Sequence, residues 1–326
     1  MSVSVMPAVR QYHSVYGVRL VTDMPFEFPD VPPEGGEALA DVEFVLGDAA
    51  DFEPFAGVGE PEGGIVCRLS LDGVTYLRWP DLYEFAVAAD GSRVVCRPLA
   101  GCDRSVLQHF LFGQVLAVAL VQQGIEPLHA SVVRVADDAI GFLGDCTFGK
   151  STLLASFVQA GYRVLTDDML ILVRRGGQAV VLPGAGRIKL YPDSANRFID
   201  CADAGTPLTA TTTKRSFPLD TARQQRTALP LRLLYVLPDP EQRDRATSIE
   251  ISPLSRAEMA HELVKNTFTT HIIDQARLAR QFAHVTQVAT EIDGFRLRYP
   301  TGLCHLVALR QAIVEHSHRW MAQRSS

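Results

Sequence analysis

The sequence has few cysteines, and no two of them form a C-x-x-C pair. The six are Cys67, Cys96, Cys102, Cys146, Cys201 and Cys304. A chain of 326 residues is long enough to bury a sizeable core without covalent links. We therefore expect reduced thiols in a cytoplasmic protein, although Cys96 and Cys102 are close enough in sequence to form a bridge.

The chain also lacks a long apolar run and an excess of positive charge. Its longest apolar stretch, VLAVALV at 115–121, is far shorter than the roughly 20 residues that span a bilayer. Acidic residues number 37 and basic residues 31, with no long run of like charge, so neither nucleic acid nor a membrane is expected as a partner. Residues 1–17 contain no basic region followed by an apolar core, and we expect no secretory signal.

The period of the apolar residues divides the chain into three parts. Short alternating runs separated by Gly, Asp and Pro predict a mostly antiparallel β domain over residues 1–102, with an exposed loop at 25–37. Helical spacing then predicts a connecting helix over 103–126. Strands and helices mix over 127–326, where the chain ends in helices, and we expect a phosphate-loop α/β domain there. The predicted class is α/β, or α+β overall.

A phosphate-binding pattern, G-x-x-x-x-G-K-[ST], lies at 144–151 between an apolar strand and a helix. Its glycines let backbone N–H groups turn toward phosphate oxygens, and the helix directs its positive N-terminus at them. Lys150 would reach the terminal phosphates, and the Ser151 hydroxyl would hold Mg²⁺. The predicted nucleotide-binding residues are Gly144, Asp145, Cys146, Thr147, Phe148, Gly149, Lys150, Ser151 and Thr152.

Two aspartates, Asp167 and Asp168, follow the next predicted strand, at 162–166. A strand–helix–strand unit makes its two strands parallel, and ligands bind beyond the carboxyl ends of such strands, so the pair should lie beside the phosphate loop. Mg²⁺ usually takes one or two carboxylates, and a second carboxylate at the same site can accept a proton from an attacking hydroxyl. The alternative is that one aspartate only caps the next segment.

One histidine, His129, is expected at the same place. The segment LHASVVRVADDAIGFLG reads as a hairpin that turns near Asp137 and Asp138. If its strands pair about that turn, His129 lies opposite the start of the phosphate loop, near Cys146. A role at the γ-phosphate and a purely structural role both remain open.

These segments together resemble a known family. LHASVV, GDCTFGKS and LTDD, in that order and spacing within 127–172, are similar to the HPr kinase/phosphorylase family. They are more similar to the HPr-kinase-like serine kinases of peptide-modification gene clusters of the lasso-peptide type. The resemblance implies an HPr-kinase-like fold and ATP-dependent phosphorylation of a serine hydroxyl on a peptide or protein, such as a ribosomally made precursor. It also leaves a homo-oligomer open.

The resemblance also implies a role for each matching residue. Lys150 and the loop would hold the β- and γ-phosphates of ATP. Ser151 and Asp168 would serve Mg²⁺, Asp167 would be the base, and His129 would lie beside the transferred phosphate.

One region departs from the HPr kinase pattern. Where those enzymes have a glycine-containing segment with a glutamate, tied to the phosphorylase activity, this chain reads LPGAGRIKLYPDSANRF at 182–198. The departure argues against the reverse reaction and against HPr as substrate. Arg187 and Lys189, and likewise Lys214 and Arg215 in a Thr-rich stretch, are candidates for binding phosphate or a peptide carboxylate, or are simply solvated.

Two other functions fit the same residues. A small-molecule hydroxyl kinase would use the same site, and a closed cavity rather than an open groove would favour it. A nucleotide-binding regulatory partner without transfer is the third possibility, but pure binding needs no base, and both aspartates are present. The residues that recognise adenine are not legible in the sequence.

Overall fold

The structure is a computed structural model that describes residues 11–24, 26, 38–57, 66–69, 72–99, 104–199, 205–209, 212–243, 245–268, 272 and 274–324. It divides into two compact units, Met1–Gln123 and Gly124–Ser326. Most of the predicted loop at 25–37 and Cys102 lie outside the described residues. Within the described part of the chain, no helix is both long and apolar enough to cross a membrane.

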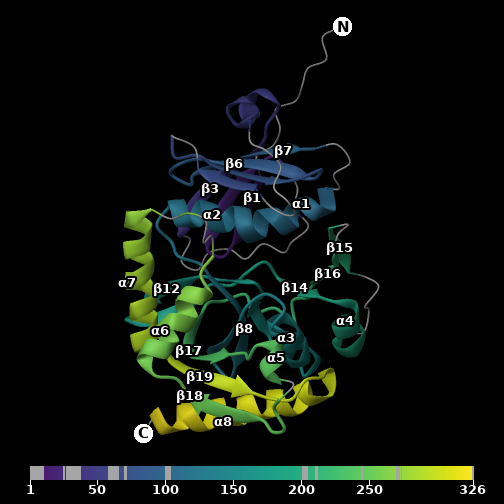
Figure 1. Ribbon diagram of the computed structural model, residues 1–326, viewed down its shortest axis with the longest axis vertical. Helices are drawn as coiled ribbons and strands as arrows, with labels where there is room; N and C mark the ends of the chain where they lie inside the picture. The colour runs from purple at the N-terminus through teal and green to yellow at the C-terminus, as the bar shows by residue number, and fades with distance from the viewer. Residues whose placement is uncertain are drawn as a thin grey trace. The chain divides into compact units, whose positions relative to one another are not determined.

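The first unit is a seven-stranded sheet with a helical segment on it (Figure 1). Its strands are β1 (Gln11–Val15), β2 (Val18–Thr22), β3 (Ala40–Leu46), β4 (Val66–Leu69), β5 (Thr75–Trp79), β6 (Tyr83–Val87) and β7 (Arg93–Pro98). Its helical segments are η2 (Ala50–Phe55), α1 (Arg104–Phe110), η3 (Leu111–Val115) and α2 (Leu116–Gln122). The strand order is β1-β2-β3-β7-β6-β5-β4. The pairs β2–β3 and β3–β7 are parallel and the other described pairs antiparallel, so this sheet is mostly antiparallel, as predicted.

The helical segment of the first unit packs on its sheet through aromatic and apolar side chains. The Phe110 ring lies 4.4 Å from that of Trp79 and 6.1 Å from that of Tyr83, centroid to centroid. Residues 115–121 are all buried, so the longest apolar run of the sequence is part of the packed interior. The helix is interrupted at Gly113, whose backbone is non-helical within a π-turn.

The second unit is a mixed sheet covered by helices, with a small sheet beside it. Its strands are β8 (Leu128–Val135), β9 (Asp138–Leu143), β10 (Val164–Thr166), β11 (Met169–Leu170), β12 (Leu172–Arg175), β13 (Gln178–Val181), β14 (Arg187–Leu190), β15 (Thr206–Thr209), β16 (Thr212–Pro218), β17 (Leu229–Val236), β18 (Glu250–Pro253) and β19 (Asp293–Arg298). Its helices are α3 (Lys150–Gln159), α4 (Pro192–Phe198), α5 (Pro240–Arg243), α6 (Arg256–Lys265), α7 (Gln275–Glu291), η5 (Leu303–His305) and α8 (Leu306–Arg324). This mixture confirms the α/β class.

Three parallel strands, β9, β17 and β19, form the centre of this sheet. Strand β17 alternates its side chains between two cores: Leu233 and Tyr235 pack with α3 and α8, and Leu234 and Val236 with α6 and α7. Figure 1 shows α6 and α7 on one side of these strands and α3 on the other. Buried on both faces, the central strands have the near-continuous apolar sequences that parallel sheets require.

The strand pairing brings the phosphate loop and the acidic pair to one edge of the sheet. Strand β8 pairs antiparallel with β9 and, on its other side, with β10. Strands β9 and β10 therefore run in the same direction, as the strand–helix–strand pattern predicts, but with β8 between them. The carboxyl ends of β9 and β10 open toward the same edge, where the loop after β9 and the aspartates after β10 both lie.

The small sheet, of order β14-β16-β15, brings another segment to this edge. Strands β14 and β16 pair antiparallel with Lys189 opposite Ser216. Strand β14 is buried along its whole length, and α3 and α4 pack together next to it. Lys189 on β14, some twenty positions beyond Asp167 and Asp168 in the sequence, is thereby held next to these two aspartates.

Candidate active site

The phosphate loop has the backbone that anion binding requires. Gly149 precedes α3 with a φ of +91°, a conformation that glycine adopts without strain, and Thr147 also has a positive φ, of 72°. The Lys150 ammonium is buried and turned back onto the loop, where it donates to the carbonyl oxygens of Gly144 and, at 3.0 Å, Asp145. Its burial lowers the pKa of Lys150. The loop therefore closes around the Lys150 ammonium, the group that the sequence predicts to reach the phosphates.

Asp167 is held by three donors from three different segments. Its Oδ1 accepts from the Ser151 hydroxyl at 3.0 Å and from the Ser131 hydroxyl at 2.6 Å. Its Oδ2 accepts from the backbone N–H of Lys189 at 3.0 Å. Asp167 as a whole is 6% exposed, so these bonds fix its carboxylate in one orientation against the hydroxyl of the phosphate loop.

Asp168 has a different environment on the same turn. Its φ is +89°, which is uncommon outside glycine and marks stored strain of the kind found at functional sites. Its carboxylate pairs with the Lys189 ammonium and lies 3.4 Å from Nδ1 of His129. Burial alone would raise the pKa of Asp168, but the charge and hydrogen bond of Lys189 outweigh it, and the pKa lies far below its ordinary value.

His129 lies where the hairpin register predicts. Ala130 pairs with Leu143, so His129 faces the start of the loop, and its Nε2 is 3.9 Å from Sγ of Cys146. Burial lowers the pKa of His129, which favours the neutral ring. Its Nδ1 lies 2.9 Å from the Asp168 carbonyl oxygen and donates to it in the neutral ring, so Nε2 is left as an acceptor toward the loop.

The four basic candidates Arg187, Lys189, Lys214 and Arg215 lie in different environments. The Lys189 ammonium forms an ion pair with Asp168, so it belongs to the site that contains the two aspartates. The Lys214 ammonium stands 5.5 Å above the Tyr191 ring, at the mouth of the site. Arg187 is buried in β14, and Arg215 pairs in β16 with Leu190. The cavity in front of the loop is lined by His129, Asp145, Cys146, Thr147, Gly149, Lys150, Ser151, Thr152, Asp167, Asp168, Lys189, Tyr191 and Lys214. It therefore contains Lys189 and Lys214, whereas Arg187 and Arg215 are not among its lining residues.

Two residues of the site were missed by the sequence reading. Ser131 stands two positions after His129 on β8, so both side chains point to the same face of the strand. The alternation of a strand could therefore have predicted Ser131 as a residue of the site. Asn266, at the end of α6, accepts from the Gly144 N–H through Oδ1 at 3.0 Å, and its carbonyl oxygen accepts from the His129 N–H at 2.6 Å. Nothing in the sequence around 266 indicates this contact.

The oxygen atoms beside the loop fit Mg²⁺. Ser151 and Asp167 offer a hydroxyl and a carboxylate in mutual contact, which are hard ligands of the type that Mg²⁺ prefers. The described residues contain no group of three or more His, Cys, Asp and Glu able to hold a metal. An ion bound by one or two side chains and by phosphates requires no such group.

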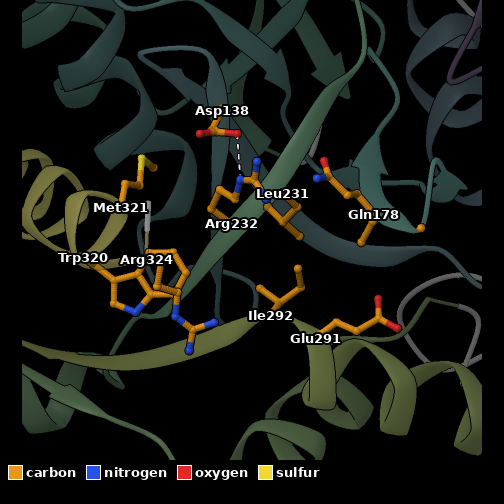
Figure 2. Close-up of a pocket in the computed structure, with 11 residues that line it drawn as sticks. Asp138, Gln178, Leu231, Arg232, Glu291, Ile292, Trp320, Met321 and Arg324 are labelled. Atoms are coloured by element: carbon orange, nitrogen blue, oxygen red, sulfur yellow. Dashed lines mark hydrogen bonds and ion pairs between the residues drawn. The ribbon is translucent and has the colours of Figure 1, made fainter. Parts of the chain in front are cut away.

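The larger cavity of this unit lies at the opposite edge of the sheet. It has a volume of about 410 Å³, and Asp138, Leu231 and Ile292, which line it, lie at or next to the amino ends of β9, β17 and β19. Figure 2 shows these side chains around the cavity. Its charged side chains already have partners: Asp138 pairs with Arg232 at 2.8 Å, Glu291 with Arg174, and Arg324 with Asp293 at 2.6 Å. The sequence offers no reactive pattern there, so the smaller cavity beside the predicted phosphate loop is the candidate site.

Comparisons with known proteins give a limited result. No protein-family model matches the sequence, and no curated protein matches it either. Among solved structures, the Hpr(Ser) kinase/phosphatase from Coxiella burnetii aligns with 61% of this chain and 94% of its own, at 14% identity and a TM-score of 0.34. A TM-score this low lies below that of a shared fold, so the functional proposal rests on the site itself.

Proposed function

We propose that the second unit transfers the γ-phosphate of ATP to a hydroxyl group of a peptide or protein, with Mg²⁺. The observation that carries the proposal is the contact between Ser151 of the phosphate loop and Asp167, 3.0 Å apart, with Asp168 as the next residue. A site that only binds nucleotide needs one such carboxylate for the metal. A second carboxylate at the reacting end is what transfer to a hydroxyl requires.

The contacts support one division of roles between the two aspartates. Asp167 touches the loop serine and has both oxygens occupied by donors, so it suits the fixed position of a metal ligand. Asp168 faces His129 and the cavity, and is the better placed of the two to take a proton from an acceptor hydroxyl. This division reverses the one that the family resemblance implies, and it is open to direct test.

Bound Mg²⁺ would neutralise charge that builds up between the β- and γ-phosphates. The chain supplies the rest. Lys150 and the loop N–H groups bind the phosphates, and neutral His129 lines the site beside them without adding charge. Asp168 accepts the acceptor's proton as the new oxygen–phosphorus bond forms and ADP leaves.

Asp168 can act as the base only if its ion pair with Lys189 is released. A carboxylate whose pKa is held far below its ordinary value is a weak base, because a general base works best with a pKa near the working pH. We propose that the Lys189 ammonium shifts from Asp168 to the phosphates when ATP binds. The acceptor would approach from the side of Tyr191 and Lys214, and its class as peptide or protein rests on the sequence resemblance.

The test compares three variants with the unaltered protein. Lys150→Met, Asp167→Asn and Asp168→Asn are assayed for Mg·ATP binding by calorimetry, and for phosphate gain by mass spectrometry on peptides encoded by neighbouring genes. Asp168→Asn should bind Mg·ATP normally and lose transfer by roughly 10²–10⁴-fold. Asp167→Asn should lose the Mg²⁺ dependence of binding, and Lys150→Met should weaken binding itself.

Two results would count against the proposal. If the unaltered protein binds Mg·ATP but transfers phosphate to no peptide or other hydroxyl, the site is a nucleotide-binding regulator. If Asp167→Asn binds Mg·ATP normally and alone abolishes transfer, the roles are those that the family resemblance implies.

A further inference from the structure

Two sets of residues border the phosphate loop on opposite sides. The acidic side comes from β8, β10 and β11 and contains His129 and both aspartates. The other side comes from the segments that follow β17 and β19, the two parallel strands beyond β9 in the sheet. Leu237, the first residue after β17, donates its N–H to the Leu143 carbonyl oxygen at 2.9 Å, so this segment lies directly against the start of the loop.

Arg243, at the end of α5, is the cation on that second side. Its Nη1 lies 3.4 Å from the position that a Cβ on Gly149 would occupy, so the guanidinium borders the loop where α3 begins. The same Nη1 donates to the Tyr299 hydroxyl at 3.4 Å, and the guanidinium carbon is 5.6 Å from the centroid of the Tyr299 ring. Tyr299 is 2% exposed and so serves as a fixed support for the arginine.

The guanidinium has donor capacity that the described residues do not use. Among the described residues, the buried Nε of Arg243 has no hydrogen-bond partner, and no carboxylate forms an ion pair with this guanidinium. Buried donors are normally satisfied, and an orphaned one requires an explanation. A ligand atom that accepts a hydrogen bond, next to the loop, provides one.

The order of the groups in ATP indicates which part of the nucleotide lies next to Arg243. In the proposed function, on which this inference rests, the γ-phosphate lies at the acidic side and the loop holds the phosphates next to it. The rest of the nucleotide must leave the loop on the other side. We infer that Arg243 binds the nucleoside part of the nucleotide, with Nε donating to it and the planar guanidinium lying against the base, and that Tyr299 positions Arg243.

The experiment separates the nucleoside part from the phosphates. Full-length protein, Arg243→Ala, Arg243→Lys and Tyr299→Phe are titrated by calorimetry with Mg·ATP and, separately, with inorganic tripolyphosphate and Mg²⁺. Arg245→Ala, which removes an exposed arginine two residues away, is the matched charge control. Thermal unfolding shows that each variant is folded before it is titrated.

Arg243→Ala should raise the Kd for ATP roughly 10–100-fold while the Kd for tripolyphosphate changes less than about threefold. Arg243→Lys should lose nearly as much, because an ammonium cannot stack or donate as a planar fork. Tyr299→Phe should show the same pattern with a smaller loss, and Arg245→Ala should bind both ligands normally.

Three results would overturn the inference, and they are distinguishable. Equal losses for both ligands would make Arg243 a phosphate ligand, and no loss for either would remove it from the site. If the unaltered protein binds neither ATP nor tripolyphosphate, the proposed function fails together with the inference.

Discussion

The two edges of the sheet in the second unit both contain a cavity, but they differ in their polar groups: those of one cavity are paired, and beside the other some are strained or unsatisfied. At the amino edge the cavity is the larger, and its aspartate, glutamate and arginines are paired with one another or with neighbours. At the carboxyl edge a buried lysine faces backbone carbonyls, Asp168 has a positive φ, and the Nε of Arg243 has no hydrogen-bond partner in the part of the chain that the structure describes. On this comparison the smaller cavity, which has the unsatisfied and strained groups, is the stronger candidate for a functional site, although its volume is smaller.

The largest effect is expected from breaking the buried Lys189–Asp168 ion pair at the carboxyl edge. Lys189→Met removes a buried partner of Asp168 and leaves its carboxylate uncompensated, so unfolding free energy should fall by about 3 kcal/mol. Because the pKa of Asp168 is depressed in the folded state, its stabilisation is present at neutral pH and is lost as the pH falls below about 4. Urea unfolding should therefore show a smaller difference between the unaltered protein and the variant at pH 3 than at pH 7.

An equal or larger difference at pH 3 would show that the Lys189–Asp168 pair does not set the acid dependence. Lys189→Arg, which keeps the charge, is the matched control and should retain most of that dependence.

A second comparison uses one glycine from each edge. Gly149 and Gly177 have φ values of +91° and +79°, and an added Cβ would meet only Arg243 at the first and nothing at the second. Alanine should cost about 1–2 kcal/mol of stability at either position, because both need a left-handed backbone. Only Gly149→Ala should also weaken ATP binding, by about tenfold or more. Calorimetry and thermal unfolding on both variants would test this, and equal ATP affinities would contradict it.

The smallest effect is expected at the amino edge. Arg232→Met breaks the pair with Asp138, whose side chains are 36% and 22% exposed. A partly solvated pair of this kind contributes about 0.2–1 kcal/mol, so stability should change little. ATP binding and phosphate transfer should be unaffected in steady-state assays. A clear change in either would mean that the larger cavity takes part in function.

The sequence predicts those parts of the site that depend on local patterns. The phosphate loop follows from one strand, one helix and the glycines between them. The position of His129 follows from a hairpin whose turn fixes the register, with Val135 opposite Asp138. The edge on which Asp167 and Asp168 lie follows from the direction of the strand before them. Each of these needs no more than one supersecondary unit.

The remaining parts depend on contacts between distant segments. Lys189 carries no local sign that its N–H will bond Asp167 and its ammonium Asp168, because that depends on how β14 docks. It therefore reads as a substrate-binding candidate in the sequence. Arg243 and Asn266 likewise look like ordinary surface residues until the tertiary structure is known. The strand inserted between β9 and β10 is also a property of the whole sheet, which no single motif encodes.

The Asn266 side chain has a consequence for how variants of this protein are interpreted. It joins the first N–H of the phosphate loop to a helix end 122 residues further along the chain. In a random-mutagenesis screen, a change there would be scored as damage to a helix cap far from any motif. On the proposed function, its effect would instead be on nucleotide binding, because the bond fixes the start of the loop. Screens that group positions by sequence neighbourhood would assign it to the wrong class.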